Sequence, residues 1–240
     1  SSMYVSGDFG KIEMGQNDGA GPTFVTFPAY GSNNLGSYDA GTYTTNSAGT
    51  ALTGVYMFPQ YGRDGDNNKI SYFSPNMGGF SFGYSYSDEG TDNADTAMGL
   101  SWSGDMAGVG VAFTAMMEDS GESTDTTENS AYGVSLTSGD MELAVSTGST
   151  KTGTTVDSTT TVYGIAYNVS DSVRISAHAV NSENDITSGD EFTAQDIGVN
   201  YTIAPGLGLH MNVMSFEATD GDATSNNNDE IGRASCRERV

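Results

Sequence analysis

Large apolar residues alternate with small or polar ones along most of the chain after residue 66. The run FSFGYSY at 80–86 shows the pattern clearly, with four aromatic residues separated by Ser and Gly. A period of two indicates a β-strand whose two faces meet different surroundings. Similar runs recur at 98–102, 109–114, 132–136, 141–146, 163–167, 173–178, 197–201 and 207–213. With shorter runs at 1–7, 9–16 and 67–75, they predict an all-β fold of about twelve strands.

The expected strands are long, and their small-residue face is unsuited to a packed core. Most run for about 9 to 12 residues, whereas strands of soluble sheets average about 5 to 6 and tilted membrane-spanning strands need about 9 to 11. A face of Gly, Ser, Thr and Ala has too little apolar volume to fill an interior, but it suits a water-filled lumen. We therefore expect a transmembrane antiparallel β-barrel, with one face toward lipid and the other toward water.

Short and long connections alternate along the chain. Tight turns rich in Gly, Asp, Asn and Pro are expected at 7–10, 74–79, 103–108, 137–140, 168–172 and 203–206. Longer segments lie between them at 17–66, 88–95, 118–128, 150–158, 183–191 and 218–230. Four of these longer segments hold four or five acids each. Tight turns at one end and long loops at the other are the layout of outer-membrane barrels.

The chain is strongly acidic. Its 240 residues include 31 Asp and Glu but only 8 Lys and Arg, which gives a net charge of −23. This balance excludes nucleic acid as a partner, because a phosphate backbone requires a basic surface. Three of the cationic residues and the only cysteine fall in IGRASCRERV at 231–240. That segment resembles translated sequencing-adapter DNA, and we expect it not to belong to the natural protein.

Two segments resemble the Gram-negative general porin family, in a form similar to its alphaproteobacterial members. They are GDFGKIEMGQNDG at 7–19 and GRDGDNNKISYFSPNMGGFSFGYSYS at 62–87. In that family a short turn leads into a strand, a long loop folds into the barrel, and a strand with an Asn-x-Ile-x-Tyr pattern follows. Here the Asn is Asn67 or Asn68, and Lys69, Ile70 and Tyr72 follow it. The resemblance implies a homotrimer in the outer membrane of a Gram-negative cell.

The same resemblance implies how the chain maps onto the sixteen strands of the family. The long segment 17–66 corresponds to the third loop, which folds into the pore. Counted from that loop, the chain starts at the fourth strand and stops after the fifteenth. We therefore expect residues 1–230 to be a partial porin barrel and the sequence to come from a fragment of a longer gene.

A charged constriction is a further implication of the resemblance. In such porins, acids on the inward-folded loop face basic residues on the wall, and charged side chains around a pore select ions by electrostatics. A solvent-exposed role without any part in the pore is the alternative for the acids. The candidates are Asp18, Asp39, Arg63, Asp64, Lys69 and Arg174.

Other polar residues fall on the alternating strand positions that we expect to face the lumen. Gln16 stands where the family often has an arginine, so the basic side of the constriction is reduced. Additional acids on the inward face would favour cations. We therefore expect a lumen that prefers cations or is only weakly selective, with these further lining residues: Gln16, Glu142, His178, Asp196 and His210.

Aromatic residues near the strand ends are candidates for the girdles that flank the apolar band of a barrel. Ordinary packing within the sheet is the alternative. The candidates are Tyr72, Tyr86, Trp102 and Tyr167.

No cofactor or metal site is expected. Asp64, Asp66 and Asn68 alternate as calcium ligands do, and so do Asp220 and Asp222. Neither run has the glycine and the distal glutamate of an EF-hand loop. Only weak binding of Ca²⁺ by the acidic loops is conceivable.

These features predict a channel for passive diffusion of small hydrophilic solutes and ions, with outer-membrane lipid as a partner and no catalytic step. Two alternatives stay open. A secreted or surface-attached acidic β-rich adhesin is one, although the fixed repeat of about 20 residues typical of a solenoid is missing. An outer-membrane lipid hydrolase is the other, and it would need a lipid-facing His and Ser, whereas His178 and His210 both have lumen parity.

Overall fold

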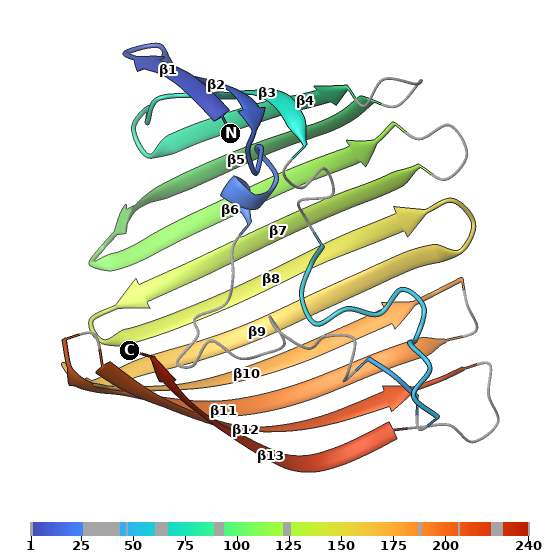
Figure 1. Cartoon of the computed structure of the whole chain (residues 1–240). Coiled ribbons are helices and arrows are strands. Elements are labelled where there is room, and N and C mark those ends of the chain that lie inside the picture. The colour runs from blue at the N-terminus through green and yellow to red at the C-terminus, as the bar shows by residue number, and fades with distance from the viewer. Residues whose placement is uncertain are drawn as a thin grey trace.

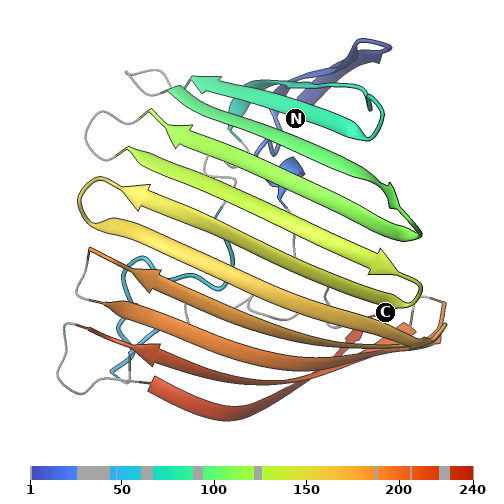
Figure 2. The same cartoon turned by 180° about the vertical axis from the view of Figure 1, so that it is seen from behind.

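A computed structural model describes residues 2–25, 44–46, 48–60, 67–88, 94–121, 126–186, 189–205, 207–221 and 228–239, the last range by its backbone alone. The thirteen strands in this part of the chain form one sheet, in which every strand pairs with its neighbours in sequence. All the pairings are antiparallel, and β1 and β13 are the two edges. The sheet curves strongly, so it has a concave and a convex side (Figures 1 and 2).

The strands lengthen along the chain. The first three are short, and β5 to β13 have 12 to 15 residues each. One short 3-10 helix, η1 (Pro22–Phe24), follows the second strand. The strands are β1 (Ser2–Gly7), β2 (Gly10–Gln16), β3 (Asn68–Phe73), β4 (Phe80–Asp88), β5 (Ala94–Met106), β6 (Val109–Ser120), β7 (Thr127–Ser138), β8 (Met141–Thr152), β9 (Val156–Ser170), β10 (Val173–Asn184), β11 (Asp190–Ala204), β12 (Leu207–Thr219) and β13 (Asn228–Arg239).

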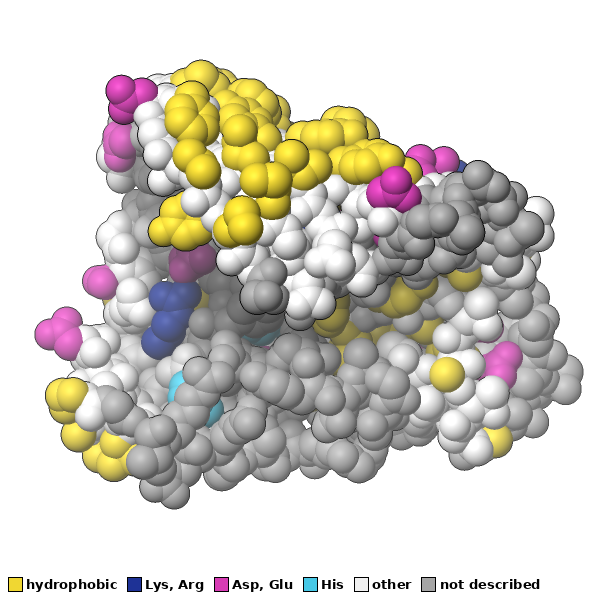
Figure 3. Space-filling view, turned by 45° about the horizontal axis from the view of Figure 1, so that its top comes forward, with side chains coloured by type: hydrophobic (Ala, Val, Ile, Leu, Met, Phe, Trp, Pro, Cys, Tyr) yellow, Lys and Arg dark blue, Asp and Glu magenta, His cyan; other side chains and the backbone are white. Residues whose placement is uncertain are grey.

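The two sides of the sheet differ as the alternation predicts. Along β4, the four aromatic residues from Phe80 to Tyr86 point to the convex side and are exposed, while Gly83, Ser85 and Ser87 point to the concave side and are buried. The other long strands repeat this division. Hydrophobic side chains gather on the outer surface at the top of Figure 3, and Lys, Arg and His side chains lie within the hollow. The convex side therefore suits lipid, and the concave side suits water.

The longer strands are tall enough to cross a bilayer. With a rise of about 3.4 Å per residue and a tilt of about 40°, a 12-residue strand gains about 30 Å in height, which exceeds the apolar band of about 25 Å. The convex positions nearest the long connections are charged, as at Glu128, Lys151 and Glu183. These strand ends therefore stand above the hydrocarbon layer. Among the described residues, no helix combines the length and apolar character that a membrane crossing requires.

Several acids expected in loops lie on strands instead. Strand pairing continues through Lys151↔Asp157 and Asn184↔Asp190, so little of 150–158 and 183–191 remains as a connection. Glu118 and Asp190 consequently have fixed positions on the concave side. Hydrogen bonding between adjacent backbones extended the sheet past the point where the apolar alternation ends.

A thirteenth strand adds to the twelve that the sequence predicts. The backbone of β13 pairs with β12 and includes most of 231–240. Pairing along the edge of a sheet uses backbone hydrogen bonds and depends little on the identity of the side chains. The adapter-like origin of this segment stays a prediction.

The long connection between β2 and β3 lies against the concave side in two described pieces. Residues 17–25, including η1, pack against the wall at β4 to β7, where Ala20, Phe24, Ala97, Met116 and Ala131 form an apolar cluster. Residues 44–46 and 48–60 form the second piece, in which Leu52, Val55 and Met57 pack with Phe192 and Phe216 in a second cluster against β9 to β12. Both pieces lie on the same side of the sheet in Figures 1 and 2.

Candidate functional site

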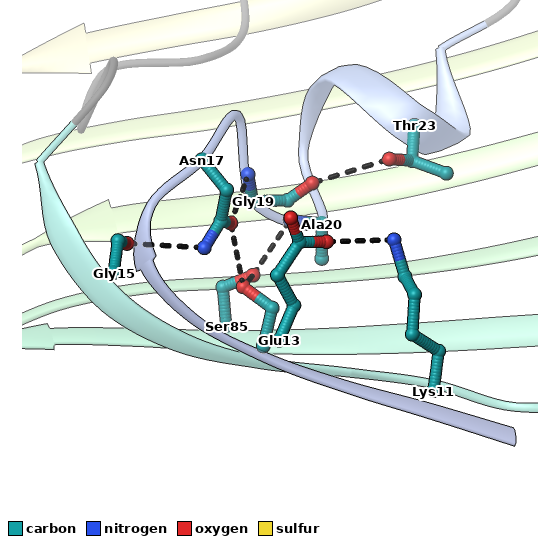
Figure 4. A network of polar contacts seen from close by, with 9 residues as sticks. Lys11, Glu13, Gly15, Asn17, Gly19, Ala20, Thr23 and Ser85 are labelled. Atoms are coloured by element: carbon teal, nitrogen blue, oxygen red, sulfur yellow. Dashed lines mark hydrogen bonds and ion pairs between the residues drawn. The ribbon is translucent and has the colours of Figure 1, made fainter. Parts of the chain in front are cut away.

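The first polar cluster of the concave wall surrounds the start of the long connection (Figure 4). On β2, the ammonium of Lys11 lies 2.6 Å from a carboxylate oxygen of Glu13 and 4.6 Å from the centre of the Phe73 ring. Next to this pair is a hollow of about 410 Å³ that Gln16 and Asp18 help to line. This hollow is polar and open, so a hydrated solute can enter it.

Lys69 lies on the concave side of β3, but it is not exposed to the lumen. Only 4% of the residue is accessible, and its ammonium donates a hydrogen bond to the carbonyl of Asn17 at 2.6 Å. Ser71 donates to the side-chain oxygen of the same Asn17 at 3.0 Å. Lys69 therefore binds the long connection to the wall. Its role in a charged constriction stays a prediction.

A second polar cluster lies on β8 to β10. Arg174 donates to Glu142 at 2.7 Å and to Asn168 at 3.1 Å. The two charged side chains remain about a third exposed, at 27% and 31%. They lie on the concave side of the sheet, close to its tight-turn end, where Arg174 pairs in register with Asn168 and Asn200.

Both histidines also point to the concave side. His178 and Asp196 are fully buried, with Nδ1 and Oδ1 3.5 Å apart, and Asn212 donates to the other carboxylate oxygen at 2.7 Å. His210 is hydrogen bonded to Asn200. Neither ring points to the convex, lipid-facing side, as the sequence parity predicts.

The second piece of the long connection is held by backbone and side-chain hydrogen bonds. The N–H of Thr53 donates to Asp190 at 2.8 Å, the N–H of Tyr56 donates to Ser182 at 2.9 Å, and Asn184 donates to the carbonyl of Thr53 at 3.0 Å. The other oxygen of Asp190 accepts from the N–H of Gly221 at 3.1 Å. One buried carboxylate thus ties two connections to the wall.

The structure covers only some of the predicted site residues. Asp39, Arg63 and Asp64, and Asp66 of the possible calcium run, lie outside the described residues. Asp220 accepts a hydrogen bond from Asn46 at 2.8 Å. Within the described ranges, no group of three His, Cys, Asp or Glu side chains is placed to hold a metal ion.

The aromatic candidates fall at both ends of the wall. Trp102 and Tyr167 are convex residues near tight turns, and Tyr72 is next to another. Tyr86 is near the opposite end of β4. Trp102 packs against Phe80 on the neighbouring strand, with ring centres 6.1 Å apart. Their role as membrane girdles stays a prediction.

Sequence reasoning missed several charged residues of the concave wall. Lys11 and Glu13 lie on the short second strand, where the alternation is weak. Glu118 and Asp190 were placed in loops, although extension of the parity of β6 and β11 would have put them on the concave side. Asp190 could not have been singled out, because its partners are remote in sequence.

An antiparallel wall of membrane-crossing strands, apolar outside and charged inside, defines a transmembrane β-barrel protein. The sequence profile of the Gram-negative porin family matches residues 1–221. The chain therefore belongs to the Gram-negative porin family, whose members lie in the outer membrane. The match does not distinguish bacterial classes, so the alphaproteobacterial likeness stays a prediction. No curated protein sequence matches the chain.

Solved porin structures share the fold. An anion-selective porin from Comamonas acidovorans superposes with a TM-score of 0.62 at 16% identity, over 99% of this chain and 72% of the other. A porin refined at 1.8 Å gives 0.63 at 15% identity, over 98% and 80%. OmpT, an outer membrane protein of Vibrio cholerae, gives 0.59 at 14% identity, over 97% and 76%.

Proposed function

We propose that the protein is a cation-preferring porin through which small hydrophilic solutes and ions diffuse passively. The segment 17–66 narrows its lumen, and the functional unit is a homotrimer. The polar concave wall supports diffusion of hydrophilic solutes through the lumen. The two packed pieces of the long connection support its role in narrowing that lumen. Solutes cross through water, without a catalytic step or an energy source.

The charge on the concave wall carries the preference for cations. Among the described strand side chains of this wall, the basic residues are Lys11, Lys69 and Arg174. Lys11 and Arg174 are each paired with a glutamate. The acids are more than twice as numerous: Glu13, Asp95, Asp105, Glu118, Glu142, Asp190 and Asp196. Such an excess raises the local concentration of cations.

The anion-selective porin from Comamonas acidovorans does not argue against this preference. At 16% identity the likeness concerns the fold, and selectivity depends on the side chains that line the lumen. Asp18, which helps to line the polar hollow, is the described candidate for the acidic side of the constriction. Asp39 and Asp64 remain candidates on the grounds of sequence.

A homotrimer is supported by the family and by one solved relative. OmpT of Vibrio cholerae is known in a trimer form, and this chain superposes on it with a TM-score of 0.59 at 15% identity. Cross-linking of the protein in native outer membranes tests the proposal. A ladder that ends at three subunits is expected, and an exclusively monomeric product would contradict it.

Channel function is tested by insertion of the full-length gene product into planar bilayers. We expect stepwise increases in conductance, and swelling of liposomes in solutions of small sugars. A barrel that inserts, resists protease and yet never conducts would overturn the proposal. The rival lipid hydrolase predicts release of fatty acid from phospholipid vesicles that is lost in His178→Ala or in His210→Ala. We expect no such release.

A further inference from the structure

The aromatic ring of Phe24 fits into a notch on the concave wall. Only 3% of this residue is accessible. Beneath it lie Gly83 on β4 and Gly99 on β5, which are direct cross-strand partners. A Cβ at Gly83 would be 2.7 Å from Cε2 of Phe24, and a Cβ at Gly99 would overlap its side chain. The ring can occupy this place only because neither strand carries a side chain there.

Polar contacts hold the residues that precede Phe24 against the same wall. The N–H of Ala20 donates to the hydroxyl of Ser85 at 2.6 Å, and this hydroxyl is 3.0 Å from that of Ser71 (Figure 4). Lys69 binds the carbonyl of Asn17, as described above. Gly21 lies so close to Glu118 that a Cβ there would overlap the carboxylate. The segment 17–24 is therefore fitted to the wall.

The same arrangement recurs where the second piece meets the wall. A Cβ at Gly148 on β8 would be 2.7 Å from Cβ of Pro59 and 2.6 Å from the backbone oxygen of Ser130 on β7. By contrast, Gly110, on the concave side of β6, has ordinary space around it, because the nearest atom to an added Cβ is 3.6 Å away. Glycine weakens a strand and often marks the close approach of another backbone or ligand. The tight glycines of this wall mark where the long connection docks.

We propose that the Gly83–Gly99 notch, filled by Phe24, positions the long connection and thereby sets the cross-section of the pore. Phe24 is a positioning residue, since it holds the segment next to Asp18 without itself lining the ion path. A filled notch keeps the conductance constant, whereas a loosened anchor lets the connection fluctuate and the current with it. This inference rests on the proposed channel function.

The test compares Gly99→Ala with Gly110→Ala in the full-length protein. Both add one methyl to a concave strand glycine, but only the first meets Phe24. In planar bilayers, Gly99→Ala is expected to broaden the distribution of single-channel conductance and to raise open-channel noise. Gly110→Ala is expected to match the parent protein. Equal effects of the two variants, or a silent Gly99→Ala, would overturn the inference.

A second measurement does not depend on conduction. In the detergent-folded barrel, chymotrypsin should cut within 17–66 roughly tenfold faster in Gly99→Ala and in Phe24→Ala than in the parent, because overpacking or loss of the ring releases the anchor. The double variant should be cut no faster than Phe24→Ala alone, since the added methyl no longer meets a ring. A parent protein that resists cleavage but never conducts would refute the proposed channel function without refuting the anchoring role of Phe24. Unchanged cleavage in the variants refutes the anchor.

Discussion

Arg174 on β10 reaches across β9 to bind Glu142 on β8, with nitrogen and oxygen 2.7 Å apart on the concave wall. Both side chains remain in contact with water, so the pair contributes only about 1 kcal/mol or less to stability. Its larger consequence is electrostatic. The two charges cancel each other at the lumen, which leaves the unbalanced acids of the wall to act on passing ions.

Removal of either member should change ion selectivity in a defined direction. Arg174→Gln unmasks Glu142 and should raise the ratio of cation to anion permeability, and Glu142→Gln should lower it. One unit charge about 6 Å from an ion in water favours a cation and disfavours an anion by about 0.7 kcal/mol each, which corresponds to a roughly tenfold change in the ratio. Zero-current potentials in a salt gradient measure it. Lys151→Gln, on the convex side, is the matched control and should change nothing. Shifts of the same sign in both lumen variants would refute this reasoning.

Asp190 should prove important for stability. Its buried carboxylate accepts the N–H groups of Thr53 and Gly221, and Asp190→Ala would leave both donors without this acceptor. We expect a loss of about 3 kcal/mol in the free energy of unfolding, measured by denaturant titration in detergent. Glu191→Ala, at the next position but on the exposed convex side, should cost less than about 0.5 kcal/mol. Similar losses in both variants would show that the hydrogen bonds of Asp190 do not contribute to stability.

The turn between β5 and β6 carries a correctable strain. Ala107 has a φ of 56° and Gly108 has a φ of 84°, so both residues are in the left-handed region. Ala107→Gly should stabilise the barrel by about 1 kcal/mol, and Gly108→Ala should destabilise it by a similar amount. Thermal unfolding in detergent gives both values. Ala112→Gly, within β6, should instead destabilise. If all three variants shifted stability in the same direction, the turn geometry would be wrong.

Trp102 offers a direct test of which side faces lipid, because it is the single tryptophan of the chain. It lies on the convex side beside Phe80, near a tight turn. Its fluorescence should be quenched by brominated acyl chains, most strongly by bromine near the headgroup, and only weakly by aqueous iodide. Strong iodide quenching without any lipid quenching would place Trp102 in water and reverse the assignment of the faces.

The period of two was sufficient to predict the sides of the sheet. It placed Phe80 and Tyr167 outside and Arg174, Glu142 and His178 inside, and the structure has them so. Successive side chains of a strand point to opposite faces because of local backbone geometry alone. The sequence of each single strand was therefore sufficient to predict which side chains share a face. Strand ends were less predictable, because pairing with the neighbouring strand carried β8 and β9 into residues that lack alternation.

Contacts of the long connection could not be predicted. One of them is the hydrogen bond from the buried Lys69 to Asn17, 52 positions away in sequence. The link between Thr53 and Asp190 spans 137 positions. Such contacts depend on where a segment without periodicity lies inside the barrel, and no local pattern encodes that. The tight glycines were visible in the sequence, but glycine is so common on this wall that those with little space were indistinguishable from the others.

The central claim is that an acidic lumen favours cations, and its most direct measurement is the zero-current potential across a bilayer that holds the full-length protein in a tenfold KCl gradient. The excess of Asp and Glu on the concave wall predicts a potential of the sign produced by K⁺ moving down its gradient, and one that diminishes as salt screens the wall charges. A potential of the opposite sign, from preferential passage of Cl⁻, would contradict it.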